Sequence, residues 1–495
     1  MTVLLERPDL IAAFDAETAR KSATGVEAVS GAGILGAGRP ARRTTVNIPH
    51  VAGLEVVGAG AHVPLATGGT VEYANLDHGA SAPALRVVKD TVDALLERYA
   101  SVHRGAGWHS KVCTSLYEGA REPVRDFVGG RADDAVIFTR HTTDSFNLLA
   151  HCLPARTTVV VFETEHHAAL LPWSAERAPA TARRRVVRLP APDSAAHAVE
   201  LVDDALRRRA PGPALLVITG ASNVTGEVWP VADLARVARS RGARVALDAA
   251  QLAPHRPFSI TGLGVDYVAL SGHKLYAPYG AGALIGRADW LAAAPPYLIG
   301  GGATASVRDE VTEFKPLPDR HEAGSPNVPG AVALATACHA LATADRAALA
   351  QAETALTDTL RRGLAAIPGV TVHSLFGERA DSIGVVTFTV AGRQPSVIAA
   401  ALSAEHGIGV RDGAFCAHPL VRRLLGAAGC TDADNGQAMR ASVGLGTTTE
   451  HVQRLVRAVE SITEHGPRLR YVVRDGRPVP AVDGRELPAI APWQR

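Results

Sequence analysis

Residues 265–280 have the sequence VDYVALSGHKLYAPYG, in which an apolar, strand-like run leads directly into a lysine, Lys274. Lysine is rarely buried without a partner. It is also scarce here, because only five of the 51 lysine and arginine residues are lysine. Two interpretations are open. Lys274 extends its amine from a strand end to water, or the amine is a nucleophile that forms a Schiff base.

One pattern surrounds Lys274 from about residue 73 to 330. Short apolar runs alternate with amphipathic stretches such as 230–242. The runs that we predict as buried strands are 135–139, 158–163, 214–220, 243–249 and 267–272. This alternation predicts an α/β fold with a mostly parallel sheet. Residues 73–330 are therefore the predicted large domain.

A smaller α+β domain is predicted over 331–470. A helical pattern continues from 331 to about 366, and the runs that follow predict a strand at 385–390, a helix at 395–407 and a strand at 408–413. At 495 residues the chain is long enough for two or more domains.

The two ends of the chain differ from these domains. Residues 1–72 are rich in glycine and short of aromatic residues, which predicts a partly flexible N-terminal extension with a helix near 8–22. The extension contains a GxGxxG pattern at 31–36, but no convincing strand precedes it and Pro40 soon follows, so we expect no dinucleotide site. Residues 471–495 form a proline-rich tail that we expect to be extended.

Composition excludes several classes of function. The net charge of +2 predicts no broad surface for nucleic acid or membranes. The longest run of small apolar residues, 330–344, is too short to span a membrane, and the N-terminus lacks the pattern of a signal peptide. The five cysteines have no CxxC spacing, which argues against disulfides or a zinc site and favours a reducing cytoplasm.

Polar residues follow several of the predicted strands, where an open α/β sheet gathers its chemistry. Asp248 ends one strand, and Gln251 follows three residues later. A carboxylate at this position would pair with the protonated pyridine nitrogen of pyridoxal phosphate. The alternative is that Asp248 only caps the turn that follows it.

Three further strand ends carry candidate residues. Thr142 and Thr143 lie between a strand and an apolar helix, where hydroxyls and N–H groups bind phosphate or where a Thr/Asp cap starts the helix. His166 follows another strand and would stack on an aromatic ring; the neighbouring histidine suggests a metal, but no third ligand lies nearby, so we expect none. Asn223 follows a fourth strand and would bond a ring substituent.

In this order, the strand-end residues resemble those of class V aminotransferase-fold enzymes of the cysteine desulfurase and selenocysteine lyase group, in its Suf-like branch. The resemblance runs from about residue 73 to 465. The stretches that carry it are NLDHGASAP, YASVHRGAGWHS, RHTTDSFNLLA, ETEHHAALLPW, ASNVTGEVWPV, ALDAAQLAPH, LSGHKLYAPYGAGAL, EAGSPN, GIGVRDGAFCAHPL and MRASVGLG. It implies fold type I of the pyridoxal phosphate-dependent transferases, with a large α/β domain and a smaller C-terminal domain.

The resemblance also implies roles for individual residues. Lys274 would form the Schiff base with the cofactor, and His166 would stack on its ring beside Asp248 and Gln251. Thr143, Ser271 and His273 would hold the phosphate. Ser325 would reach the phosphate of a neighbouring subunit, which implies a homodimer. The residues expected at the amino-acid substrate are Arg440, Arg411, His103 and Asn223, with the Arg440 guanidinium suited to the carboxylate.

Cys416 lies in RDGAFCAHPL, at the position of the family's cysteine. It is either a small buried apolar residue or a nucleophile that takes the substrate sulfur as a persulfide. A nucleophilic thiolate needs a nearby cation, for which Arg411 and His418 are candidates. Relatives often carry histidine just before this cysteine, whereas this chain has Ala414 and Phe415.

The predicted function is conversion of L-cysteine to L-alanine with a persulfide on Cys416, and a sulfur-acceptor protein would be a further partner. The alternatives are a C–S lyase, an epimerase or an aminotransferase that acts on another amino acid. A non-catalytic docking protein is disfavoured, because Lys274, Asp248 and His166 are all present.

Overall fold

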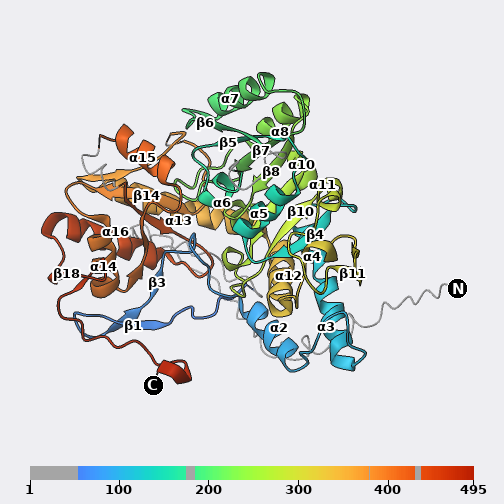
Figure 1. Ribbon diagram of the computed structural model, residues 1–495. Coiled ribbons are helices and arrows are strands. Elements are labelled where there is room, and N and C mark those ends of the chain that lie inside the picture. Colours follow the sequence, from blue (N-terminus) through green and yellow to red (C-terminus); the bar gives the residue numbers. More distant parts are fainter. Residues whose placement is uncertain (1–53, 174–183, 378, 430–435, 495) are drawn as a thin grey trace, which may run out of the picture. The chain divides into compact units, whose positions relative to one another are not determined.

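The structure is a computed structural model that describes residues 54–173, 184–377, 379–429 and 436–494 (Figure 1). The described residues belong to one compact unit, Val46–Arg495. The helix predicted near 8–22 and the GxGxxG pattern lie outside the described residues.

A seven-stranded sheet forms the larger part of the fold, in the order β4-β10-β9-β8-β7-β5-β6. Strands β9, β8, β7, β5 and β6 run parallel, and β10 is antiparallel to both of its neighbours. The mostly parallel sheet is thus confirmed, and β6 and β10 are strands that we did not predict. The bounds are β4 Ala135–Thr139, β5 Thr158–Phe162, β6 Arg185–Leu189, β7 Ala214–Thr219, β8 Arg244–Asp248, β9 Tyr267–Ser271 and β10 Gly282–Gly286.

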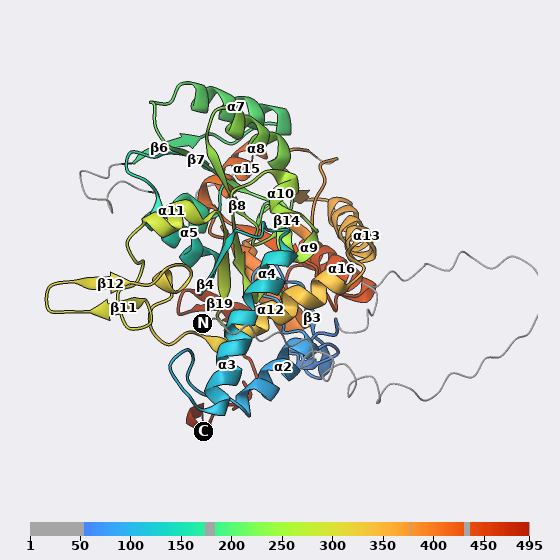
Figure 2. The same cartoon turned by 90° about the vertical axis from the view of Figure 1, so that its right-hand side faces the viewer.

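Helices cover both faces of this sheet, because alternate strand residues point to opposite sides. Val160 packs in one core with residues of α2, α4, α7, α8 and α12, whereas Val159 and Val161 pack in a second core with α5, α6 and α11. Figure 2 shows α2, α3, α4 and α12 grouped together, in agreement with their contacts. The bounds are α2 Arg86–Leu96, α3 Trp108–Gly119, α4 Arg121–Phe127, α5 Thr142–Cys152, α6 His167–Leu170, α7 Ala195–Arg207, α8 Val231–Ser240, α11 Ala288–Ala293 and α12 Val328–Thr343.

A second, antiparallel sheet has the order β13-β14-β17-β16. Its strands are β13 Val370–Val372, β14 Val385–Val390, β16 Arg411–Gly413 and β17 Ala438–Ser442, and α13 Arg346–Ala365, α14 Pro395–His406 and α16 Thr449–His465 pack nearby. The helical pattern predicted to about 366 is two helices, because Asp345 caps α13 by accepting a hydrogen bond from the Ala348 N–H. The strand predicted at 408–413 is divided between β15 Ile408–Gly409 and β16. The domain boundary at 330 stays a prediction.

Both terminal segments contain hairpins where they are described. Residues 54–72 include β1 His62–Pro64 paired with β2 Thr70–Glu72, and the next strand, β3 Ala74–Asn75, pairs in parallel with β15. The tail that we expected to be extended forms a hairpin of β18 Tyr471–Arg474 and β19 Arg477–Pro480, which packs against α14. Within the described part of the chain, no helix combines the length and the hydrophobicity that a membrane crossing requires.

Short elements complete the fold and place several loops. They are α9 Leu252–His255, α10 Ile260–Leu263, α15 His418–Ala427, β11 Thr304–Val307, β12 Thr312–Phe314, and the 3-10 turns η4 Gly272–Lys274, η5 Asp319–His321 and η7 Pro492–Gln494. Of these, η4 and α15 matter most for the site, because η4 ends at Lys274 and α15 begins just after Cys416.

Candidate active site

A cavity of about 510 Å³ lies where the ends of the parallel strands meet loops of the second sheet. Most of the residues singled out from the sequence line it, although they come from distant parts of the chain. They are Thr142, Thr143, His166, Asn223, Asp248, Gln251, Ser271, His273, Lys274, Arg411, Cys416 and Arg440. Two of the predicted site residues, His103 and Ser325, are not in its wall.

Lys274 reaches this cavity because β9 ends at Ser271 and the 3-10 turn η4 redirects the chain. Its side chain is partly buried. Burial lowers the pKa of Lys274 to about 8, although the nearby Asp248 carboxylate opposes this effect. Within the described residues, no hydrogen bond engages the amine. A partly neutral, unbonded amine is suited to nucleophilic attack on a carbonyl.

Asp248 is buried at the carboxyl end of β8. One of its oxygens, Oδ1, accepts a 2.9 Å hydrogen bond from the Ala250 N–H. Asp248 therefore caps the turn that follows it, as one of the two interpretations of the sequence predicts. No hydrogen bond from the described residues reaches the second oxygen. Burial raises the pKa of Asp248, and Lys274 acts in the opposite direction. The same carboxylate therefore caps the turn and keeps one oxygen for a bound group.

The strand-to-helix turn at β4 and α5 is tied to β9. The Thr142 N–H donates to Ser271 Oγ at 2.9 Å, and the two hydroxyl oxygens are 2.8 Å apart. The cap of α5 is His141 rather than a threonine or aspartate, because its Nδ1 accepts the Asp144 N–H at 3.2 Å. Thr143 is exposed to the cavity. The hydroxyls and N–H groups of this turn form a suitable cradle for a phosphate.

Two imidazoles in the cavity wall are neutral. His166 caps α6, with its Nδ1 accepting the Ala168 N–H at 3.0 Å, and burial lowers its pKa to about 3. Burial also lowers the pKa of His273 to about 4, and the charge of Lys274 adds to this effect. A neutral His166 ring is suited to stacking on another ring rather than to binding an anion.

Gln251 is held beside Asp248 by a hydrogen bond from its Nε2 to the carbonyl oxygen of Gly79, at 2.7 Å. This contact joins the end of β8 to the loop that follows β3. Gln251 is buried, and it still lines the cavity.

Arg440 is buried on β17 and faces the cavity. Its guanidinium donates to the Asn223 carbonyl at 2.9 Å and to Asp77 at 3.3 Å, whereas Arg411 lies 3.3 Å from the other Asp77 oxygen. The buried Nε of Arg440 has no partner among the described residues. Two guanidiniums around one carboxylate leave excess positive charge, which is suited to an anionic substrate group.

Cys416 is exposed, whereas the other described cysteines are buried and all four are free. The interpretation of Cys416 as a buried apolar residue is therefore wrong. Phe415 and Cys416 have φ angles of 52° and 53°, in the left-handed region that side chains rarely adopt. Two hydrogen bonds of 2.7 Å hold this strained turn: the Asn223 amide donates to the Phe415 carbonyl, and the His167 N–H donates to the Cys416 carbonyl.

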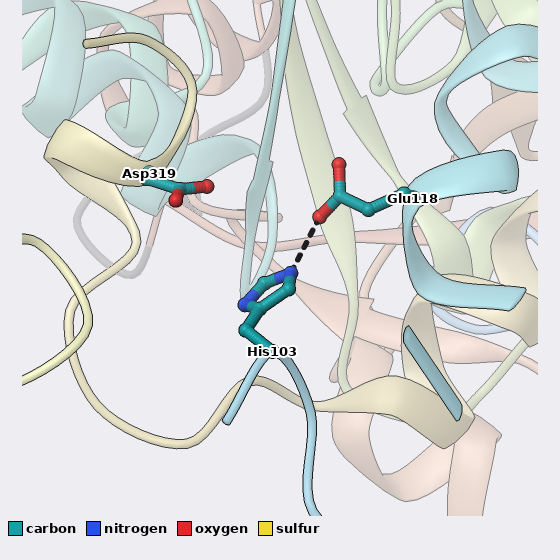
Figure 3. A group of neighbouring side chains, drawn as sticks. All are labelled: His103, Glu118 and Asp319. Carbon is teal, nitrogen blue, oxygen red and sulfur yellow. Dashed lines mark hydrogen bonds and ion pairs between the residues drawn. The ribbon is translucent and has the colours of Figure 1, made fainter. Parts of the chain in front are cut away.

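His103 and Ser325 lie together in a second cavity of about 380 Å³. Figure 3 shows His103 bonded to Glu118, with Asp319 on another segment. The ligand atoms of these three side chains lie within 4.8 Å of one another. However, Glu118 also accepts from Arg121 and Asp319 accepts from Lys315, so we assign no metal there. Within one chain, the structure does not bring His103 to the cavity of Lys274.

Sequence reasoning missed several residues at the Lys274 cavity. Asp77, His141 and His167 belong to stretches that were recognised, but their roles depend on contacts across the fold. For His418, the sequence indicates only a cation near Cys416. Sequence spacing does not show that these residues lie at the cavity. The contact of Arg440 with Asp77, for example, joins residues 363 positions apart.

Comparison with known proteins gives a consistent result. Residues 74–455 match the family described as Aminotransferase class-V. A probable cysteine desulfurase of Vibrio cholerae is 34% identical over 397 residues, which cover 79% of this chain and 93% of that protein. A probable cysteine desulfurase of Mycolicibacterium paratuberculosis is 33% identical over 399 residues, which cover 79% of this chain but only 55% of that longer protein.

Solved structures are also similar. The cysteine desulfurase CsdA of Escherichia coli has a TM-score of 0.67 at 32% identity, covering 79% of this chain and 95% of that one. An apo cysteine desulfurase of Thermococcus onnurineus has a TM-score of 0.69 at 29% identity, with the same coverage of 79% and 95%. These likenesses confirm the predicted fold class, fold type I of the pyridoxal phosphate-dependent transferases.

Proposed function

We propose that this chain, which belongs to the class-V aminotransferase family, is a cysteine desulfurase-like enzyme. In this proposal it uses pyridoxal phosphate, converts L-cysteine to L-alanine and holds the sulfur on Cys416. The observation that carries this proposal is the position of Cys416. An exposed thiol, the Lys274 amine and the Arg440 guanidinium line one cavity. Amine, anion site and nucleophilic sulfur are the three groups that the reaction needs.

The residues of the cavity fit pyridoxal phosphate. Lys274 offers an amine without a hydrogen bond within the described chain, and Asp248 keeps one oxygen for the pyridine nitrogen. His166 offers a neutral ring for stacking, and Gln251 would contact the ring hydroxyl. Thr143, Ser271 and His273 would hold the phosphate, with Thr142 fixing Ser271. The cavity of about 510 Å³ is of the usual size for a small-molecule site.

When bound, pyridoxal phosphate supplies an electron sink that stabilises negative charge beside the amino group of a substrate. Asp248 would favour this chemistry by keeping the ring nitrogen protonated. Lys274 would act as the general base at the substrate α-carbon. Its lowered pKa of about 8 leaves a useful fraction of neutral amine near neutral pH.

The substrate would be oriented by its carboxylate. Arg440 has a buried Nε without a partner among the described residues, and Arg411 lies on the adjacent strand. Asn223 is fixed between Arg440 and the Cys416 loop, so it would set the distance between the bound carboxylate and the thiol. Cys416 would then attack the sulfur of L-cysteine and become a persulfide, which leaves alanine.

We also propose that the protein is a homodimer and that the second cavity lies at its interface. His103 and Ser325 line it together, and Ser325 would reach the cofactor phosphate of a neighbouring subunit. His103 would act at the substrate only across the same interface.

We also propose that residues 73–330 are the cofactor-binding domain and 331–470 the small domain, that the enzyme works in the cytoplasm, and that a sulfur-acceptor protein removes the persulfide sulfur.

The decisive experiment compares the wild-type protein with Cys416→Ala. Both would show the absorbance of bound cofactor, because Cys416 is not among the residues proposed to hold it. Given L-cysteine, only the wild type would form alanine and a sulfur adduct that a reductant releases as sulfide. Cys416→Ala could instead keep the wild-type rate of another reaction. Pyruvate would then indicate a C–S lyase, racemised product an epimerase, and transaminated product an aminotransferase. A wild-type protein that stays colourless with added pyridoxal phosphate would contradict the cofactor assignment.

A further inference from the structure

We propose that His418 is the general base that accepts the thiol proton of Cys416, and that His167 positions it. This inference rests on the proposed function, because it assigns the proton transfer that a persulfide-forming cysteine needs. The two residues that precede the cysteine in this chain, Ala414 and Phe415, cannot transfer protons.

His418 and Cys416 both line the active-site cavity. His418 is the first residue of α15, two positions after Cys416, and both side chains are exposed. The left-handed conformation at Phe415 and Cys416 turns the chain sharply just before this helix. An exposed imidazole two residues from Cys416 can pass a proton to water, which a fully buried one cannot.

His167 connects the two residues. Its backbone N–H donates to the Cys416 carbonyl at 2.7 Å, and its imidazole contacts the imidazole of His418 edge to face, with ring centroids 4.7 Å apart. One residue therefore fixes the backbone of the nucleophile and the ring of its partner. Burial lowers the pKa of His167, and the adjacent His418 adds to this effect.

Three other titratable groups of the cavity wall have other roles. In the proposed function Lys274 and His166 serve the cofactor, and His166 Nδ1 already accepts the Ala168 N–H. Asp412 is paired with Arg477 of the tail hairpin at 2.9 Å.

The Cys416 thiol gives its proton to His418, and the thiolate forms an S–S bond with the sulfur of L-cysteine. The carbon–sulfur bond of the substrate breaks, and its electron pair stays on carbon. That carbon takes up one proton, which matches the one lost by Cys416, and becomes the methyl group of alanine. The sulfur is oxidised to the persulfide level and the carbon is reduced, so no external oxidant is needed.

The test follows Cys416 in the holoenzyme by mass spectrometry of its peptide. One arm measures the rate of persulfide formation after a pulse of L-cysteine, and the other measures alkylation by iodoacetamide at neutral pH. The variants are His418→Ala and, as a matched control, His465→Ala, an exposed histidine at the end of α16. The absorbance of the bound cofactor checks folding. If His418→Ala loses the cofactor, His418→Gln is measured in its place.

We expect His418→Ala to slow persulfide formation about 100-fold, a typical contribution of a general base, and to slow alkylation. Added imidazole should restore most of both rates, and His465→Ala should behave as wild type. Unchanged rates in His418→Ala, or losses that imidazole does not restore, would overturn the proposal. If the wild type forms no persulfide from L-cysteine, the proposed function fails, and the alkylation arm alone still decides the role of His418.

Discussion

The side-chain amide of Asn223 donates a 2.7 Å hydrogen bond to the carbonyl oxygen of Phe415, and so joins the end of β7 to the loop that carries Cys416. Asn223 also accepts, at its own carbonyl, a hydrogen bond of 2.9 Å from Arg440. Asn223 therefore links the Cys416 loop to the anion site, alongside the bond from the His167 N–H to the Cys416 carbonyl. Because Phe415 and Cys416 are held in the left-handed region, the bond from Asn223 to Phe415 also offsets local strain.

Asn223→Ala is expected to uncouple the Cys416 loop from the cofactor cavity. The variant leaves the Phe415 carbonyl without its donor, so unfolding free energy should fall by about 1–3 kcal/mol. Persulfide formation should fall about tenfold, since small displacements of reacting groups have large effects on rate, while cofactor absorbance is kept. Urea unfolding and a persulfide assay measure the two effects. Gln351→Ala, at an exposed position of α13, is the control. Wild-type persulfide formation in Asn223→Ala would refute the coupling.

The buried amine of Lys274 should make stability depend on pH in the cofactor-free protein. Folding lowers the pKa of Lys274 from 10.5 to about 8, so between these values the unfolded chain holds a proton that the folded chain has released. The unfolded state binds more protons there, and the stability of the folded state rises with pH across this window. Below about 8 the cost of burying the charged amine is present in full.

The measurement is urea unfolding of wild type and Lys274→Met from pH 7 to 11. The stability advantage of Lys274→Met should shrink as pH rises from about 8 to 10.5. Lys111→Met, which replaces an exposed lysine of α3, should follow the wild-type curve. Parallel curves for Lys274→Met and wild type would show that the amine is not desolvated.

Arg440→Lys tests the anion site. Lysine keeps the positive charge but loses the forked geometry that bonds Asn223 and Asp77 and leaves Nε for a ligand. We expect the KM for L-cysteine to rise about tenfold or more, with a smaller change in kcat. Arg457→Lys, an exposed residue of α16 paired with Glu450, should change neither constant. An unchanged KM would place the substrate carboxylate elsewhere.

Glu405 anchors the tail, so its removal should release residues 471–495. This buried carboxylate of α14 accepts hydrogen bonds from the N–H groups of Arg468 and Leu469 and from the Tyr471 hydroxyl, at 2.9, 3.1 and 2.9 Å. Glu405→Ala should lower the unfolding free energy by about 2–4 kcal/mol, since hydrogen bonds to a charged group are the strong ones. Limited proteolysis should cut the tail hairpin sooner than in wild type. Glu464→Ala, at an exposed site of α16, is the control, and equal cleavage rates would show that Glu405 does not hold the tail.

Much of the fold was predictable because its signals are local. The strands β4, β5, β7, β8 and β9 coincide with apolar runs to within a residue or so at each end, since a strand buried on both faces has apolar residues throughout. The apolar pattern did not predict β10, GALIG, because two of its five residues are glycine and its antiparallel pairing with β4 and β9 is a tertiary property. It also did not predict β6, RVVRL, because two of its five residues are arginine. It also merged α12 with α13, because the break at Asp345 depends on a single capping bond.

The sequence by itself determined which chemical groups this protein holds: an amine at a strand end, a carboxylate three residues before Gln251, hydroxyls at a helix start, and a cysteine beside a glycine-containing turn. These are properties of residue type and spacing, so they can be recognised along the chain. Only the tertiary structure decided how the groups are used. In the folded chain Cys416 is exposed, and Asp77 forms ion pairs with two arginines. The ring of His167 on α6 contacts the ring of His418 on α15. Such contacts join residues hundreds of positions apart, and the packing of two sheets, which no local pattern records, sets their geometry.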